Sequence, residues 1–321
     1  MSKIKIGIAG STDSVNQYLP FINEQKHYEL VGVFDSSKSE NFETFYGLNP
    51  FLDFAKRTDA VLFCGAQHLN LAENLINCIR LSKHILIEKF NQIDYYDLVK
   101  IQKLLKEAGS LFYYSNVSGT QSVYTTARQL INNPSNISAK VHLPYVKTFS
   151  ELEKYNFLAE SVDMVIRSVS SPIAKIKVNR HYIFNQQPDE LKVHLLFDNG
   201  TVADITYNLF SKNAINTFTA YQKGKIIAAD FDLNKVEETR VDMMMENQLS
   251  LYNDSNSNLT VANKMQVFEK KILYFDALQK DLLNFVDCIT NHVSPLVGIE
   301  EAINVANVLQ QIQYTPHESF V

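Results

Sequence analysis

The chain has 321 residues, of which 45% are hydrophobic and 20% are charged. This composition is ordinary for a globular protein, and the length favours two domains over one. A formal net charge of −5 argues against a nucleic-acid-binding surface, which would be basic, and no stretch approaches the ~18 apolar residues of a membrane span.

The three cysteines, Cys64, Cys78 and Cys288, are widely spaced and form no CxxC or Cys/His cluster. Such cysteines are typical of reduced thiols rather than of a disulfide framework, and their spacing supports no metal site. The apolar stretch near the N-terminus is too short for the core of a signal peptide. We therefore expect a cytoplasmic protein with no metal and no membrane or nucleic-acid partner.

The chain begins with a short apolar strand at residues 4–10, which ends in a turn through Gly10, Ser11 and Thr12. A buried strand that turns sharply into a helix is typical of the first unit of a nucleotide-binding fold. The dinucleotide fingerprint has glycine at three positions, and this turn keeps only the first. Thr12 and Val15 stand at the other two, so the turn alone is weak evidence.

Apolar strands alternate with amphipathic helices through residue 115. Strands are expected at 28–34, 59–64, 83–90 and 110–115, and helices at 15–24, 41–47, 69–81 and 95–108. This alternation predicts a doubly wound parallel sheet of the Rossmann type. Right-handed crossovers bring the carboxyl ends of the strands to one edge of that sheet. The residues expected to converge there are Gly10, Asp35, Cys64, Gly65, His68, Glu88 and Lys89.

Asp35 follows the second predicted strand directly. A carboxylate in this position can accept hydrogen bonds from both hydroxyls of an adenosine ribose and repels a 2′-phosphate, which favours NAD over NADP. The alternative is an ordinary turn or capping aspartate, because Ser36 and Ser37 come next.

The pattern changes after about residue 118. Helices are expected at 123–131 and 152–169, alternating strands between 173 and 231, and closing helices at 275–291 and 299–312. Asp198-Asn199-Gly200 separates two alternating stretches, which indicates an antiparallel hairpin. This half is predicted to be an α+β domain with an open, mostly antiparallel sheet covered by helices on one face. We place a dinucleotide-binding domain at 1–118 and a substrate and oligomerisation domain at 119–321.

The sequence resembles the glucose–fructose oxidoreductase / inositol dehydrogenase / MocA (Gfo/Idh/MocA) oxidoreductases over essentially its whole length. The resemblance rests on KIGIAG at 5–10, VGVFD at 31–35, DAVLFCGAQHLNLAENLINCI at 59–79, KHILIEKF at 83–90 and DLLNFVDCITNHVSPLVGIEEAINVANVL at 281–309. It implies a nicotinamide cofactor, NAD with NADP as the alternative, lying across residues 10–12, 35, 64–68 and 88–89. It also implies a sugar-like substrate held between the domains, over the open sheet.

The family carries an EKP motif whose lysine helps to place the nicotinamide and the substrate hydroxyl and often serves as acid or base. Lys89 occupies that position, after Glu88, although Phe90 replaces the proline. A partly buried lysine near a cofactor gives up its proton more readily than one in water, which suits such a role. The alternative is that Lys89 only pairs with Glu88 or another carboxylate.

The family's second element is a helix with the pattern Asp-x-x-x-His-x-x-Asp that faces the nicotinamide. The corresponding residues are Asn156, Glu160 and Asp163, whose spacing places them on one helix face. Glutamate cannot replace histidine as a neutral donor and acceptor at pH 7. The resemblance implies Lys89, Glu160 and Asp163 as catalytic residues and Asn116 and Asn156 as substrate-binding residues. The alternative is a helix face exposed to solvent.

Two functions follow from these patterns. The first is an NAD(P)-dependent oxidoreductase that moves a hydride between a nicotinamide and a hydroxyl-bearing carbon of a sugar-like or polyol substrate. The second, favoured by the missing glycines and histidine, is a degenerate family member that binds a nucleotide or sugar as a sensor or assembly subunit. The uncovered sheet face predicts a homodimer or homotetramer.

Overall fold

The structure is a computed structural model, and it describes residues 3–34, 50–65, 70–88, 93–115, 120–145, 149–182, 188–241, 265–271, 276–295 and 297–315. The chain divides into two compact units. Residues 1–118 and 275–310 form the first unit, and residues 119–274 and 311–321 form the second.

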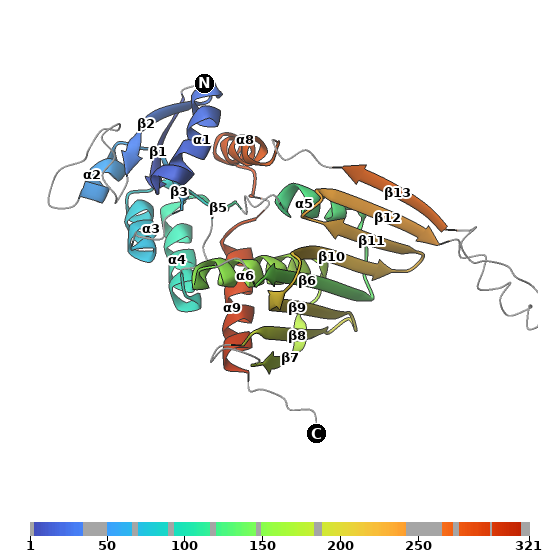
Figure 1. The fold of residues 1–321 in the computed structure, drawn as a ribbon. Coiled ribbons are helices and arrows are strands. Elements are labelled where there is room, and N and C mark those ends of the chain that lie inside the picture. The colour runs from blue at the N-terminus through green and yellow to red at the C-terminus, as the bar shows by residue number, and fades with distance from the viewer. Residues whose placement is uncertain are drawn as a thin grey trace, which may run out of the picture. The chain divides into compact units, whose positions relative to one another are not determined.

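The first unit is built on a parallel five-stranded sheet with the strand order β2-β1-β3-β4-β5 (Figure 1). The strands alternate with helices, as predicted for a doubly wound fold. The elements are β1 (Ile4–Gly10), α1 (Thr12–Glu24), β2 (Tyr28–Phe34), α2 (Pro50–Lys56), β3 (Ala60–Cys64), α3 (Leu71–Arg80), β4 (His84–Ile87), α4 (Tyr95–Ala108) and β5 (Phe112–Tyr114). The chain passes from β2 across β1 to β3, which is the change of direction where such folds bind nucleotides.

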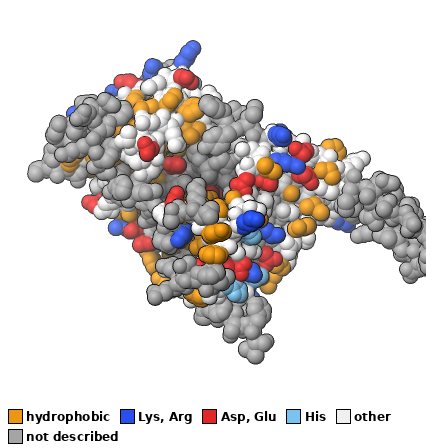
Figure 2. Space-filling model, in the orientation of Figure 1, with side chains coloured by type: hydrophobic (Ala, Val, Ile, Leu, Met, Phe, Trp, Pro, Cys, Tyr) orange, Lys and Arg blue, Asp and Glu red, His pale blue; other side chains and the backbone are white. Residues whose placement is uncertain are grey.

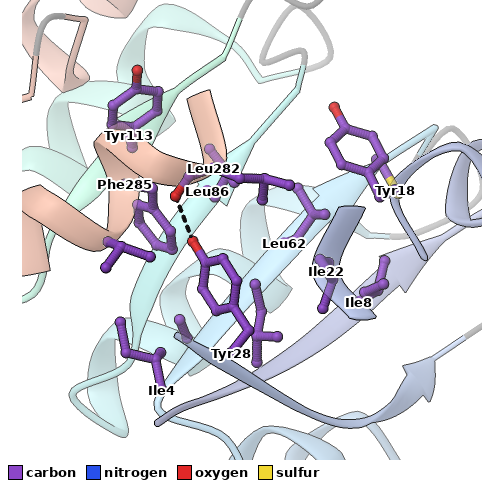
Figure 3. Packing of buried hydrophobic residues seen from close by; sticks show 14 of the residues in the cluster. Ile4, Ile8, Tyr18, Ile22, Tyr28, Leu62, Leu86, Tyr113, Leu282 and Phe285 are labelled. Carbon is purple, nitrogen blue, oxygen red and sulfur yellow. Dashed lines mark hydrogen bonds between the residues drawn. The ribbon is translucent and has the colours of Figure 1, made fainter. Parts of the chain in front are cut away.

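The strands of this sheet are mostly apolar, and charged side chains within them, such as Lys5 of β1 and Glu29 of β2, are exposed. All five residues of β3 are buried, and Ile6 and Ile8 of β1 are completely buried. Continuous burial is expected for a parallel sheet covered on both faces. On one face, residues of α1 such as Tyr18 and Ile22 join these strands in a single hydrophobic cluster (Figure 3).

The closing helices are α8 (Asp276–Asn291) and α9 (Ile299–Tyr314). From the sequence, residues 275–310 were placed in the second domain, whereas in the structure they pack with the first unit. The reason is burial, because Leu282 and Phe285 lie completely buried in the cluster formed by α1 and the parallel sheet. The hydroxyl of Tyr28 also donates a hydrogen bond to the Leu282 carbonyl oxygen at 2.7 Å (Figure 3).

The second unit contains an eight-stranded sheet in the order β13-β12-β11-β10-β6-β9-β8-β7. Its described pairings are antiparallel except for the parallel pair β6 and β9, which confirms the predicted mostly antiparallel sheet. The elements are α5 (Thr120–Leu130), β6 (Asn136–Pro144), α6 (Glu151–Ser168), β7 (Ile173–His181), β8 (Glu190–Phe197), β9 (Val202–Ser211), β10 (Ile215–Gln222), β11 (Lys225–Asp230), β12 (Lys235–Val241) and β13 (Met265–Lys271).

The strands of this sheet are buried on one face only. Val193, Leu195 and Phe197 of β8 are buried, while Leu196 between them is exposed. Helix α5 contacts β11 and β12, and α6 contacts β6 and β9. The sheet therefore has one face covered by helices, as the alternating sequence predicts.

The predicted hairpin joins β8 to β9. Gly200 has a φ of 85°, in the region that favours glycine, and the Asn199 side-chain oxygen accepts a hydrogen bond from the Thr201 N–H at 3.0 Å. The sequence missed α2, β6, β12 and β13. Strands β12 and β13 carry many charges that pair across the sheet, as Lys235 and Glu269 do at 2.8 Å, so they lack an apolar signal.

The helix predicted at 41–47 lies outside the described residues. In the described part of the chain, no helix is long and apolar enough to cross a membrane. On the face shown in Figure 2, acidic and basic side chains are interspersed with hydrophobic ones.

Candidate functional site

The turn between β1 and α1 lies at the carboxyl edge of the parallel sheet. Gly10 is the last residue of β1 and stands opposite Cys64 of β3. A Cβ atom on residue 10 would lie 1.7 Å from the Cys64 carbonyl oxygen, so only glycine fits. The two strands therefore approach closely where they end, and the β1–α1 turn lies beside Gly65, the residue after β3.

Ser11 is the N-cap residue of α1, but its side chain makes no capping hydrogen bond to the helix backbone. Its hydroxyl instead donates to the Ser14 hydroxyl oxygen at 3.1 Å. The N–H groups of a first helical turn carry partial positive charge and suit an anion such as a phosphate. Thr12 begins the helix, and the exposed carboxylate of Asp13 opposes an anion there.

Val15, which stands at the third glycine position of the fingerprint, is a core residue. It is completely buried in the cluster of the parallel sheet, together with Tyr18 and Ile22 of the same helix face. Helix α1 therefore packs on the sheet through a valine side chain where the fingerprint has glycine.

Gly65 follows β3 and has a φ of +53°, a backbone conformation that L side chains rarely adopt. A Cβ there would lie 2.2 Å from the Ser14 hydroxyl oxygen and 2.5 Å from that of Ser11. The Gly65 N–H donates a hydrogen bond to Glu88 Oε2 at 3.2 Å. The ends of β1, β3 and β4 are thus in contact, which is the convergence that the predicted topology requires.

Cys64 takes part in this junction as a packing residue. Its side chain is buried, and burial together with the nearby Glu88 carboxylate raises the pKa of the thiol above its ordinary value. A thiol in this state is a poor nucleophile.

The residues predicted for the cofactor edge divide into two groups. The structure brings together Gly10, Ser11, Thr12, Cys64, Gly65 and Glu88. Asp35, His68, Lys89 and Asn116 lie outside the described residues. Sequence reasoning missed Ser14, although its spacing from Ser11 places both hydroxyls on one side of the first helical turn.

Helix α6 of the second unit carries the other candidate residues. It begins with a capping box, in which the Ser150 hydroxyl oxygen accepts from the Glu153 N–H at 3.2 Å and Glu153 accepts from the Ser150 N–H at 2.8 Å. Asn156, Glu160 and Asp163 are only 8%, 6% and 1% exposed. This face of the helix is therefore buried, and the alternative of a solvent-exposed face does not apply.

Asp163 is held by an ion pair within its own helix. Its Oδ2 atom lies 2.6 Å from a guanidinium nitrogen of Arg167, one turn further along. The guanidinium also stacks over the ring of Tyr124 at 4.9 Å, and the Tyr124 hydroxyl donates to the Met164 carbonyl oxygen at 2.9 Å. This pairing suits a structural or positioning role for Asp163 better than proton transfer.

Comparison with known proteins supports the fold from another direction. No protein-family model and no curated protein matches the sequence. Among solved structures, UDP-N-acetylglucosamine 3-dehydrogenase GnnA from Acidithiobacillus ferrooxidans aligns with a TM-score of 0.80 and 13% identity over 98% of both chains. A dehydrogenase (MviM) from Clostridium difficile aligns with a TM-score of 0.75 and 16% identity over 98% of this chain and 100% of that one. Biliverdin reductase from Synechocystis, in complex with biliverdin and NADP+, aligns with a TM-score of 0.70 and 12% identity over 98% and 99%.

Proteins of this fold class hold a dinucleotide at the carboxyl edge of the parallel sheet. The described residues fit such a group at its pyrophosphate. Gly10 keeps the first glycine of the fingerprint, and the Ser11 side chain makes no capping hydrogen bond to the start of α1. Thr12 adds a side chain at the position of the second glycine. The motifs of the sequence and the whole-chain structural matches agree, and the chain has the two-domain fold of the Gfo/Idh/MocA-type dehydrogenases.

Proposed function

We propose that this protein is an NAD(P)-dependent oxidoreductase that acts on a hydroxyl-bearing carbon of a sugar-like or polyol substrate. The observation that carries the proposal is the junction of Gly10, Gly65 and Glu88 at the carboxyl edge of the parallel sheet. Structural neighbours that match the whole chain include a UDP-N-acetylglucosamine 3-dehydrogenase and a reductase bound to NADP+. When bound, the cofactor supplies the hydride chemistry, and the protein supplies orientation and electrostatics.

The proposed residue roles follow the order of the chain. Residues 10–12 and the first turn of α1 bind the pyrophosphate, and Asp35 binds the adenosine ribose and favours NAD over NADP. The loop 64–68 and Glu88 complete the cofactor edge. Lys89 and Glu160 handle the proton of the substrate hydroxyl, while Asn116 and Asn156 bind substrate. Asp163 holds Arg167 over the Tyr124 ring of α5 and in this way positions the helix that carries Glu160.

The first unit is proposed as the dinucleotide-binding domain and the second as the substrate and oligomerisation domain. The sequence boundary near residue 118 is kept in this proposal, and α8 is assigned to the cofactor domain because it completes the hydrophobic core of that domain.

Thermal unfolding with and without NAD and NADP tests cofactor binding directly. A ligand present at ~100 times its dissociation constant adds about 2.7 kcal/mol to the free energy of unfolding. We expect a shift with both cofactors and a larger one with NAD. If neither NAD nor NADP at millimolar concentration shifts the thermal unfolding, the proposal is contradicted.

Removal of the proposed acid/base residue tests the chemical step. In Lys89→Ala we expect turnover to fall by roughly 10²-fold or more, with cofactor binding largely retained. Lys103→Ala on α4 removes an exposed lysine of the same unit and serves as the control. If both variants turn over at the same rate, Lys89 has no part in the reaction.

A second function is favoured by specific departures from the family pattern. Thr12 and Val15 replace fingerprint glycines, and Glu160 replaces the histidine of the helix motif. These features suit a protein that binds a nucleotide or sugar as a sensor or assembly subunit without turnover. Cofactor binding in the absence of any hydride transfer to or from a panel of sugars, polyols and nucleotide sugars would favour this second function.

We also propose that the second unit pairs with another copy of this chain through the sheet face opposite α5 and α6. Exposed apolar side chains lie on that face, and Leu196, Tyr221 and Val267 occupy one row across the sheet. Sedimentation should show a dimer or tetramer that Tyr221→Glu shifts toward the monomer. A wild-type monomer at all concentrations would contradict this pairing.

A further inference from the structure

Glu88 forms hydrogen bonds to the backbone at the end of the neighbouring strand β3. Glu88 Oε2 accepts a hydrogen bond from the Gly65 N–H at 3.2 Å, and the Glu88 N–H donates to the Phe63 carbonyl oxygen at 2.9 Å. Glu88 thus holds the end of β3 through both its side chain and its main chain.

Gly65 in turn packs against the start of α1. Its Cα faces the hydroxyls of Ser14 and Ser11, so closely that a Cβ would lie 2.2 Å and 2.5 Å from their oxygens. The two hydroxyls are themselves hydrogen-bonded at 3.1 Å. A displacement of Gly65 therefore changes the packing of the β1–α1 turn, because no space separates Gly65 from Ser11 and Ser14.

We propose that Glu88 is a positioning residue for the cofactor, which holds Gly65 against the first turn of α1. This inference rests on the proposed function, and it replaces the direct cofactor contact that the family resemblance implies for Glu88. In this role the length of the Glu88 side chain is what matters, because it places the acceptor oxygen at the Gly65 N–H. The charge of the carboxylate has no direct effect on the nicotinamide.

Two conservative variants separate the effect of the Glu88 side-chain length from the effect of its charge. Glu88→Gln keeps the side-chain length and an acceptor oxygen but removes the charge. Glu88→Asp keeps the charge but withdraws the acceptor by one methylene. Glu73→Gln, on the exposed surface of α3, is the matched control for removing a carboxylate in the same unit.

The affinities of the full chain for the oxidised and reduced forms of NAD, or of NADP if the wild type prefers it, are measured by calorimetry. We expect Glu88→Asp to weaken both forms about tenfold and Glu88→Gln to stay within about threefold of the wild type. The control should be unchanged. A direct charge effect would give the opposite pattern, in which Glu88→Gln weakens mainly the oxidised, positively charged nicotinamide and Glu88→Asp resembles the wild type.

Hydrogen exchange of the Gly65 amide provides a readout that needs no cofactor. Protection of this amide should fall in Glu88→Asp and persist in Glu88→Gln. If the wild type binds the cofactor and Glu88→Asp binds it with the same affinity, the positioning role is wrong and the proposed function stands. A wild type that binds no nicotinamide dinucleotide overturns the proposed function, and the positioning role for a cofactor falls with it.

Discussion

The two sheets of this protein place their polar residues in opposite ways. In the parallel sheet the strands are mostly apolar, and the candidate residues Gly10, Gly65 and Glu88 lie where strands end. In the antiparallel unit the strands alternate, and the candidate residues lie buried along helix α6. The first arrangement depends on backbone geometry, because it works through close approach and N–H groups. The second depends on charge pairing, because Asp163 is buried beside Arg167.

The largest expected effect concerns the core of the parallel unit. Phe285→Ala removes a completely buried ring that α8 contributes to the cluster around β1 and β3, and should cost about 3–5 kcal/mol of unfolding free energy. Leu283→Ala on the exposed side of the same helix is the control, with an expected cost of about 0.5 kcal/mol or less. Urea unfolding measures both. Equal costs would mean that α8 does not belong to this core.

The next effect tests the backbone geometry of the strand ends. Gly10→Ala would place a Cβ against the backbone of Cys64, which cannot move aside as a side chain can, and should cost about 3 kcal/mol. Gly109→Ala also replaces a glycine, at a φ of 64° with no atom within 4 Å of its Cβ, and should cost about 1 kcal/mol. A Gly10→Ala variant no less stable than Gly109→Ala would show that the strands do not meet this closely.

A smaller effect tests the charge pairing in α6. Asp163→Asn leaves the Arg167 guanidinium without its carboxylate and should cost about 2 kcal/mol, below the value for a fully buried pair because Arg167 keeps 19% exposure. Asp53→Asn removes one partner of the exposed pair with Lys56 and should cost about 0.5 kcal/mol or less. If Asp163→Asn lowers turnover while the free energy of unfolding stays unchanged, Asp163 acts in catalysis rather than in positioning.

The smallest expected effect is a dependence of stability on pH, which arises from His84 at the amino end of β4. Burial lowers the pKa of His84 below its usual value of 6.5, and the neutral ring accepts a hydrogen bond from the Leu111 N–H through Nδ1 at 3.1 Å. At pH values below 6.5 the unfolded chain binds a proton that the folded chain resists, so stability falls as the pH decreases through this range. His84→Asn keeps an acceptor but does not titrate. Its unfolding free energy should fall less between neutral and acidic pH than that of the wild type, and an equal fall would exclude His84 as a source.

Local patterns predicted much of this fold. The apolar alternation between residues 4 and 115 predicted the parallel sheet, and Asp198-Asn199-Gly200 predicted the hairpin between β8 and β9. Strands β12 and β13 escaped prediction because their charged residues are satisfied by partners on the neighbouring strand, as Lys235 is by Glu269. A strand can therefore form without an apolar sequence when the neighbouring strand supplies the opposite charge.

What the sequence by itself determined is the order of strands and helices and the residue types at the strand ends, since both depend on periodicity and turn chemistry within short stretches. Only the tertiary structure decided that α8 completes the first core, that Glu88 binds Gly65, and that the face of α6 that carries Asp163 is buried. The first two contacts join segments distant in the chain, and the third depends on what packs against the helix. Their energies come from packing and desolvation, which no local pattern records.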